Sequence, residues 1–167
     1  MRERSTSRGA RRDREFEAFV AGAAGRLLQT ATLLTAEPPD DNPGARRLLT
    51  GALARTYASW DRLRDEDPYD RTRRNLATRF ARGTWSRYGA LGRWRRDPGG
   101  VLAGLSPPER LVLVLRLYEG LAEEQTAALL GLSAERVRAL CMRAATTVLR
   151  PPGGPARVAP VAGVSPS

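Results

Sequence analysis

The side chains best suited to chemistry in this chain are arginines on one predicted helix near the C-terminus. Arg136, Arg138 and Arg143 fall on outward positions if residues 134–148 are helical. A guanidinium presents a fixed fork of donors that matches the acceptor edge of guanine or two phosphate oxygens. The pattern favours nucleic-acid binding, with these candidate contact residues: Ser133, Arg136, Arg138, Ala139 and Arg143.

Enzyme chemistry finds little support in the sequence. The chain has no histidine, which excludes a Ser-His-Asp triad, a histidine zinc site and a histidine general base. Cys141 is the single cysteine, so neither an intramolecular disulfide nor a cysteine metal cluster can form. No glycine-rich phosphate loop with its lysine is present. We therefore expect a non-enzymatic protein that binds no cofactor and no metal ion.

A helix-turn-helix over residues 123–145 is the element expected to position the arginines. Ala127 supplies the small residue needed where two helices cross, and Gly131 tolerates the positive φ of the turn. Ser133 can cap the second helix by accepting from a free amide. A plain helical hairpin with a solvated arginine face is the alternative. The positions expected to face inward are Leu130, Leu132, Val137, Leu140, Cys141, Ala144 and Val148.

Apolar residues at steps of three and four predict four further helices, over 15–34, 45–63, 69–88 and 106–119. Ser106 and Glu109 have the spacing of a capping box at the start of the last of these, and Gly120 ends it. No alternating strand pattern is seen. The residues expected to face inward include Leu27, Leu34, Leu49, Thr56, Thr72, Leu76, Phe80, Leu111, Val114, Leu115 and Tyr118.

These elements predict an all-α protein of two small helical modules, 15–88 and 105–150, joined by a short linker over 89–104. A basic arm over 1–14 and a tail over 151–167 are expected to be disordered. All 28 basic residues are arginine, the net charge is +10, and the basic excess lies in 1–14 and 61–96. This balance favours a polyanionic partner. We expect a cytoplasmic protein without a membrane segment, because no signal peptide or long apolar run is present.

The second module resembles the promoter −35-binding domain of extracytoplasmic-function sigma factors. The likeness rests on the Leu-Ser-Pro-Pro-Glu start at 105–109, the apolar helix after it, and the helix-turn-helix that ends in Arg143-Ala144. Residues 15–20, 53–60 and 73–76 resemble the family's other module, which grips the polymerase clamp and opens the −10 element. The resemblance covers roughly residues 15–150. The chain is similar to the short members of this family that are common in actinobacteria.

The resemblance implies a promoter-recognition factor. Its expected partners are double-stranded promoter DNA and bacterial core RNA polymerase, with an anti-sigma factor as a further candidate. In the family, the third helix of the first module contacts the −10 element and captures flipped bases, where an aromatic side chain can stack. We expect Phe80 to be a core residue, whereas Trp85 suits either role. The matching −10 candidates are Arg73, Arg74, Arg79, Arg82, Trp85 and Arg87.

One departure from the family falls in the expected polymerase-binding segment. The family usually has Ala-Glu-Asp-Leu early in its second helix, whereas this chain has Ala-Arg-Arg-Leu over 45–48, and Thr50 where glutamine is usual. The polymerase-binding candidates are therefore Arg46, Arg47, Leu48 and Thr50. Two alternatives follow: a helix-turn-helix regulator that does not engage core polymerase, and a protein-interaction module.

Overall fold

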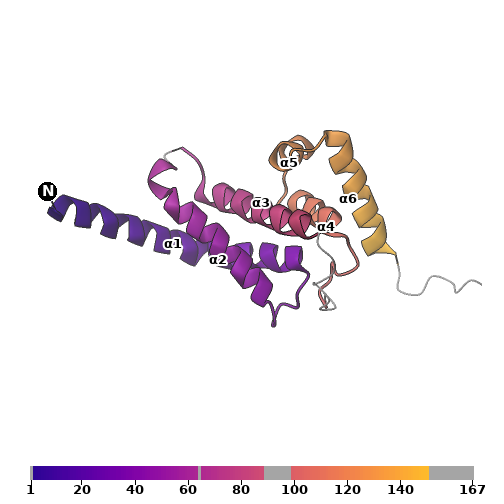
Figure 1. Ribbon diagram of the computed structural model, residues 1–167, viewed down its shortest axis with the longest axis horizontal. Helices are drawn as coiled ribbons and strands as arrows, with labels where there is room; N and C mark the ends of the chain where they lie inside the picture. Colours follow the sequence, from indigo (N-terminus) through magenta and orange to yellow (C-terminus); the bar gives the residue numbers. More distant parts are fainter. Residues whose placement is uncertain (1, 64, 89–98, 151–167) are drawn as a thin grey trace, which may run out of the picture.

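The computed structural model describes residues 2–63, 65–88 and 99–150, with side chains except at 2–8 and 84–88. In this part of the chain the regular elements are all helical, as predicted (Figure 1). The elements are α1 (Arg2–Thr35), α2 (Pro43–Ala58), a 3₁₀ turn η1 (Trp60–Arg62), α3 (Pro68–Tyr88), α4 (Pro107–Leu113), a π-helical turn η2 (Val114–Tyr118), α5 (Glu123–Leu130) and α6 (Ala134–Leu149).

Helix α1 corrects the prediction of a disordered basic arm, because it begins at Arg2 and runs unbroken past residue 14 (Figure 1). Local and tertiary contacts support this segment. Arg11 and Glu15 form an i,i+4 ion pair at 2.7 Å. The Tyr57 hydroxyl accepts from Arg12 at 2.7 Å and donates to Asp13. The sequence pattern predicted this helix only from residue 15, because its N-terminal part has no apolar stripe.

Helices α1, α2 and α3 pack together through the predicted apolar faces. Leu27, Leu34 and Leu76 are fully buried, and Phe80 is a core residue as expected. A small polar cluster lies within this core: the Thr56 and Thr72 hydroxyls are 2.9 Å apart, and the Asn75 amide donates to Thr56 Oγ1 at 3.0 Å. Each of these buried polar groups therefore has a partner, which is the condition for burying them at low cost.

The C-terminal half begins at the predicted cap and then departs from the predicted helix. The Ser106 backbone amide and hydroxyl both donate to the Glu109 carboxylate, at 3.1 and 2.6 Å. After α4 the chain widens into η2, where the Glu119 amide bonds the Val114 carbonyl at 2.9 Å. Gly120 then ends the helix with a φ of +71°.

The π-helical turn changes which side chains face inward. A wider turn rotates the residues after it relative to a regular α-helix. Tyr118 was predicted to face inward and is exposed, whereas the side chain of Glu119 is completely buried. The prediction for Tyr118 was therefore wrong, because it assumed an unbroken 3.6-residue period.

The two halves of the chain share one continuous apolar core, which runs from α1, α2 and α3 into α4, η2 and Ala144 of α6. The buried Arg110 donates to the Leu34 carbonyl of α1 at 3.0 Å and to the Leu105 carbonyl at 2.9 Å. Leu102, at the end of the predicted linker, is also buried. The predictions for residues 89–98 and for the tail over 151–167 lie outside the described residues.

Candidate nucleic-acid interface

The turn of the helix-turn-helix has the geometry that the sequence predicts. Gly131 has a left-handed backbone with a φ of +66°, and the next residue, Leu132, donates its amide to the Ala127 carbonyl at 3.0 Å. Ser133 Oγ accepts from the Arg136 amide at 3.2 Å and so caps α6. These bonds fix the angle at which α6 leaves α5.

A small apolar cluster beneath the turn holds the two helices together. Val112 of α4, Ala127 of α5, and Val137 and Leu140 of α6 are buried in it, with Leu130, Leu132 and Cys141 packed at its edge. Thr126 stands where a larger apolar residue is usual, and its buried hydroxyl donates to the Ala122 carbonyl at 3.0 Å. Val148 was predicted to face inward and is exposed, because the last turns of α6 extend past this cluster.

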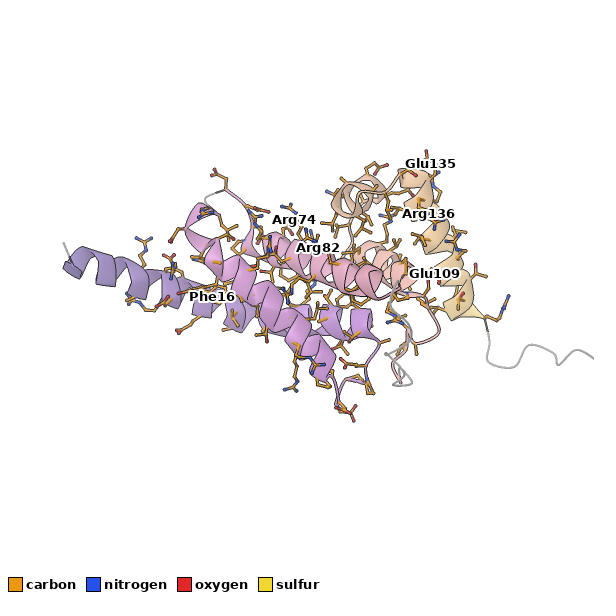
Figure 2. All side chains as sticks on the ribbon, in the orientation of Figure 1. Phe16, Arg74, Arg82, Glu109, Glu135 and Arg136 are labelled. Atoms are coloured by element: carbon orange, nitrogen blue, oxygen red, sulfur yellow. The ribbon has the colours of Figure 1, made fainter. Side chains whose placement is uncertain are left out.

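The outward face of α6 carries the predicted arginines, of which Arg136 is labelled in Figure 2. Arg136 lies in the first turn of the helix and is exposed, as are Arg138, Met142 and Arg143, while Ala139 is half-buried. Arg138 pairs with Glu123 at 2.6 Å, and Arg143 pairs with Glu109 at 3.3 Å. The first turns of α6 therefore present one exposed guanidinium and a second one held by a carboxylate of α5.

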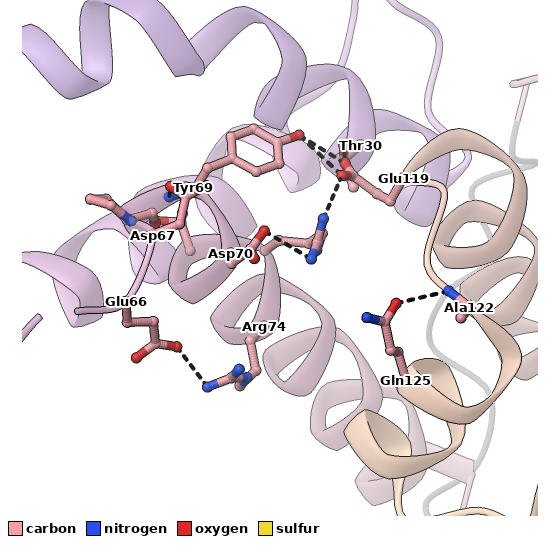
Figure 3. Close-up of polar contacts among 12 residues, drawn as sticks. Thr30, Glu66, Asp67, Tyr69, Asp70, Arg74, Glu119, Ala122 and Gln125 are labelled. Atoms are coloured by element: carbon pink, nitrogen blue, oxygen red, sulfur yellow. Dashed lines mark hydrogen bonds and ion pairs between the residues drawn. The ribbon is translucent and has the colours of Figure 1, made fainter.

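Helix α3 distributes its basic side chains over several environments. Arg74 is exposed and pairs with Glu66 at 2.8 Å (Figure 3). Arg82 is also exposed. The exposed Arg79 lies over Gly51 of α2, where an added Cβ would meet its guanidinium. Trp85 and Arg87 belong to α3, but their side chains lie outside the described residues.

Among the −10 candidates whose side chains the structure describes, Arg73 is the one that points toward the C-terminal half rather than toward solvent. Its side chain is only 18% exposed, and it pairs with Asp70 at 2.9 Å and with Glu119 at 3.6 Å. No sequence pattern indicated a role for Glu119, since a glutamate before a helix-ending glycine is usually solvated.

The polymerase-binding candidates lie near the start of α2. Arg46, Arg47 and Thr50 are exposed and Leu48 is half-buried. Arg46 Nε donates to Asn42 Oδ1 at 3.0 Å, and the Thr50 hydroxyl donates to the Arg46 carbonyl at 2.8 Å. The structure therefore places these four residues on one helix, separate from α6.

Local contacts shift the pKa values of several acidic groups. Burial raises the pKa of the Tyr69 phenol well above its usual range, and the nearby charge of Glu119 raises it further. The Ser106 hydroxyl, by donating to Glu109, lowers the pKa of that carboxyl. A backbone hydrogen bond and the Ser133 hydroxyl lower the pKa of Glu135 in the first turn of α6.

The described residues show no metal site and no membrane-spanning helix. No group of three or more acidic, cysteine or histidine side chains is placed to hold a metal ion there. None of the helices within 2–63, 65–88 and 99–150 combines the length and the hydropathy that a membrane span requires.

The capped turn and the exposed arginines of α6 define a DNA-binding protein of the helix-turn-helix class. Residues 101–148 match the family described as "Sigma-70, region 4". The chain is 32% identical over 149 residues to the RNA polymerase sigma-E factor of Streptomyces coelicolor, covering 78% of this chain and 81% of that protein. The factor of the same name from Streptomyces avermitilis is also 32% identical, with 78% and 80% covered. The chain belongs to the extracytoplasmic-function family of RNA polymerase sigma factors. Sigma factors are non-enzymatic transcription proteins.

Two solved structures share the fold. The sigma factor RpoE from Bartonella quintana, in complex with the anti-sigma factor NepR, matches with a TM-score of 0.55 and 16% identity, over 80% of this chain and 94% of that one. The anti-anti-sigma factor PhyR from the same organism, also complexed with NepR, matches with a TM-score of 0.53 and 16% identity, over 79% of this chain and 48% of that one.

Proposed function

We propose that this sigma factor directs core RNA polymerase to promoters by using three separate surfaces. The outward face of α6 reads the −35 element in the duplex, with the contact residues Ser133, Arg136, Arg138, Ala139 and Arg143. The basic face of α3 contacts the −10 element, and the exposed start of α2 docks on the polymerase clamp. These activities place the protein with DNA and polymerase in the cytoplasm.

The observation that carries the −35 assignment is the Ser133 cap after the left-handed Gly131. Together they place Arg136 and Arg138 in the first turns of α6, on its exposed side. The N-terminal residues of a recognition helix are those that contact base edges in the major groove. Arginine forks there match guanine O6 and N7.

An anti-sigma factor is the further partner that we propose. Its support is that the sigma factor RpoE, which shares the fold, was solved in complex with the anti-sigma factor NepR. We also propose that residues 15–88 and residues 105–150 form two functional modules. The first module contacts the −10 element and the second contacts the −35 element.

Co-purification with core RNA polymerase, followed by run-off transcription from genomic fragments, tests the proposal. Polymerase binding with promoter-dependent transcripts is the expected result. Retained duplex binding without polymerase binding would instead identify a regulator built on a sigma-factor fold. Failure to bind DNA at low salt, where electrostatic binding is strongest, would point to a protein-interaction module.

A further inference from the structure

The carboxylate of Glu119 is a buried charge with several polar partners at the contact between the two halves of the chain (Figure 3). Its side chain has no exposed surface, although Leu117 and Tyr118 just before it are exposed. The Tyr69 hydroxyl donates to its two oxygens at 3.0 and 3.1 Å, and the Thr30 hydroxyl also donates to it. Tyr69 belongs to α3 and Thr30 to α1, so the C-terminal half places its carboxylate among donors of the N-terminal half.

Two guanidinium groups complete the surroundings of this carboxylate. Arg73 Nη1 of α3 lies 3.6 Å from Glu119 Oε2, and Arg26 Nη2 of α1 lies 3.8 Å from the same oxygen. Both guanidinium groups also lie within 6 Å of the Tyr69 ring centroid. A buried carboxylate is tolerated only when it is paired and hydrogen-bonded, and Glu119 meets both conditions.

The π-helical turn is what aims Glu119 inward. Across η2 the inward face shifts, so that Leu117 and Tyr118 are exposed while Glu119 is buried. Such single-turn widenings inside helices occur frequently at functional sites. An unpartnered carboxylate at this position would turn toward solvent. The inward direction of Glu119 therefore depends both on the π-helical turn and on the four side chains that pair with its carboxylate.

The same contact takes a candidate −10 residue out of solvent. Arg73 cannot reach a phosphate or a base while Glu119 and Asp70 hold its guanidinium. Beside it, a cleft of about 480 Å³ separates α3 from α5. Its walls include Arg73, Arg74 and Thr78 from α3, and Gln125 and Leu129 from α5. The C-terminal module therefore covers one side of the helix that is proposed to meet the −10 element.

We propose that Glu119 is an intramolecular latch. By holding Arg73 it keeps the C-terminal module docked on α3, and a single-stranded DNA backbone competes with Glu119 for that guanidinium. The inference rests on the proposed function only in assigning α3 to the −10 element. Release of the latch uncovers a cationic group and one wall of the cleft in a single step.

The test is single-stranded DNA binding by the full chain, with a fluorescein-labelled thymidine 12-mer at low salt as the probe. Glu119→Gln keeps the shape of the side chain and removes its charge. We expect its affinity for the probe to rise about fivefold to tenfold over the wild type, since one charge-assisted contact becomes available to the strand. The matched control is the exposed Glu124→Gln, which changes the net charge equally. Equal affinities for the two variants would overturn the latch.

Two further measurements separate release from unfolding or a general charge effect. Small-angle scattering should give a larger radius of gyration for Glu119→Gln than for Glu124→Gln, with unchanged helix content by circular dichroism. Adding Arg73→Ala to Glu119→Gln should abolish the gain in probe affinity, and a retained gain would overturn the role of Arg73.

Tyr69→Phe, which removes one donor without a charge change, should give a smaller gain in the same direction. If Glu119→Gln fails to fold, an unchanged probe affinity of Tyr69→Phe overturns the latch.

The probe assay contains no polymerase, so its result for the latch is independent of the test of the proposed function. Absence of promoter-directed transcripts from the wild type would reject the sigma-factor role and leave the latch standing. Absence of any gain in the Glu119 variant would reject the latch and leave that role standing.

Discussion

Glu123, the first residue of α5, holds the guanidinium of Arg138 on α6 through two contacts. Arg138 Nη2 lies 2.6 Å from Glu123 Oε1, and Arg138 Nε lies 3.2 Å from Glu123 Oε2. The Glu123 side chain is 16% exposed, whereas that of Arg138 is 66% exposed. A paired fork of this kind fixes the plane of the guanidinium while it stays open to a ligand.

Replacing Arg138 should weaken promoter discrimination. If its fork reads a guanine in the −35 element, Arg138→Ala loses about 1–3 kcal/mol of preference for the correct duplex. Glu123→Gln should lose part of that preference, because the guanidinium is then less firmly oriented. Titration of specific and scrambled duplexes at one salt concentration measures both effects. Equal losses on the two duplexes would make Arg138 a phosphate contact, and no loss would remove it from the site.

Most of the helical segments were predictable from the sequence because they bury a regular apolar stripe, which the first part of α1 lacks and η2 interrupts. The capping serines at 106 and 133 and the glycines at 120 and 131 marked helix ends through their local chemistry. Helix α3 begins at Pro68, one residue before its predicted start.

The parts that the sequence could not predict depend on contacts between distant residues. Glu119 and Thr30 meet across 89 positions of chain, and a single buried glutamate leaves no periodic trace. The same contact explains why Arg73, expected on an open basic face, is largely covered. Helix α1 begins earlier than predicted because Tyr57 of another helix holds Arg12 and Asp13.

Arg110 should be needed for stability although it is charged. It is buried and donates to the carbonyls of Leu34, Leu102 and Leu105 at 3.0, 3.2 and 2.9 Å. Arg110→Met keeps the apolar stem and removes that donor, although the Leu102 carbonyl keeps the Leu105 amide at 3.1 Å as a donor. Each unsatisfied buried group costs about 1–3 kcal/mol, so the free energy of unfolding should fall by more than ~2 kcal/mol.

Urea denaturation followed by circular dichroism measures the Arg110 effect. The control is Arg62→Met, at an exposed arginine of η1. It should change the free energy of unfolding by less than ~0.5 kcal/mol. A comparable loss in both variants would show that net charge, rather than the three carbonyls, accounts for the result.

The pH dependence of stability should be flat near neutrality and fall on both sides. Glu109 has a lowered pKa when folded, so its contribution is present above the unfolded pKa and is lost as the pH falls below about 5. Tyr69 has a raised pKa when folded, so its contribution is complete below the unfolded pKa and is lost above about pH 10. The chain has no histidine to titrate between these limits.

Urea denaturation at a series of pH values checks both sides of this profile. Ser106→Ala removes the hydroxyl that most lowers the Glu109 pKa and should reduce the acid-side loss. Tyr69→Phe removes the phenol and should reduce the alkaline-side loss. An alkaline decline of the same size in Tyr69→Phe and in the wild type would show that another group causes it.

Reversing the charge at the start of α2 should strengthen polymerase binding. Arg46 and Arg47 are exposed where sigma factors of this family usually carry Glu and Asp. A clamp surface complementary to those acids repels two arginines, and electrostatic mismatch of this kind weakens docking and slows association. The double variant Arg46→Glu/Arg47→Asp should therefore bind core RNA polymerase about tenfold more tightly, which corresponds to ~1.4 kcal/mol. Fluorescence anisotropy of the labelled chain titrated with core enzyme gives the affinity.

The matched control for the α2 reversal is Arg55→Glu/Arg62→Asp, which makes the same charge change at exposed positions near the other end of α2 and on η1. An equal gain from this control would attribute the effect to overall charge rather than to the docking face. Weaker binding by Arg46→Glu/Arg47→Asp would show instead that the two arginines are themselves polymerase contacts. The clamp surface that binds Arg46 and Arg47 would then have to be acidic. At this position the polymerase bound by this chain would differ from polymerases whose clamp fits the Glu-Asp pair that is usual in the family.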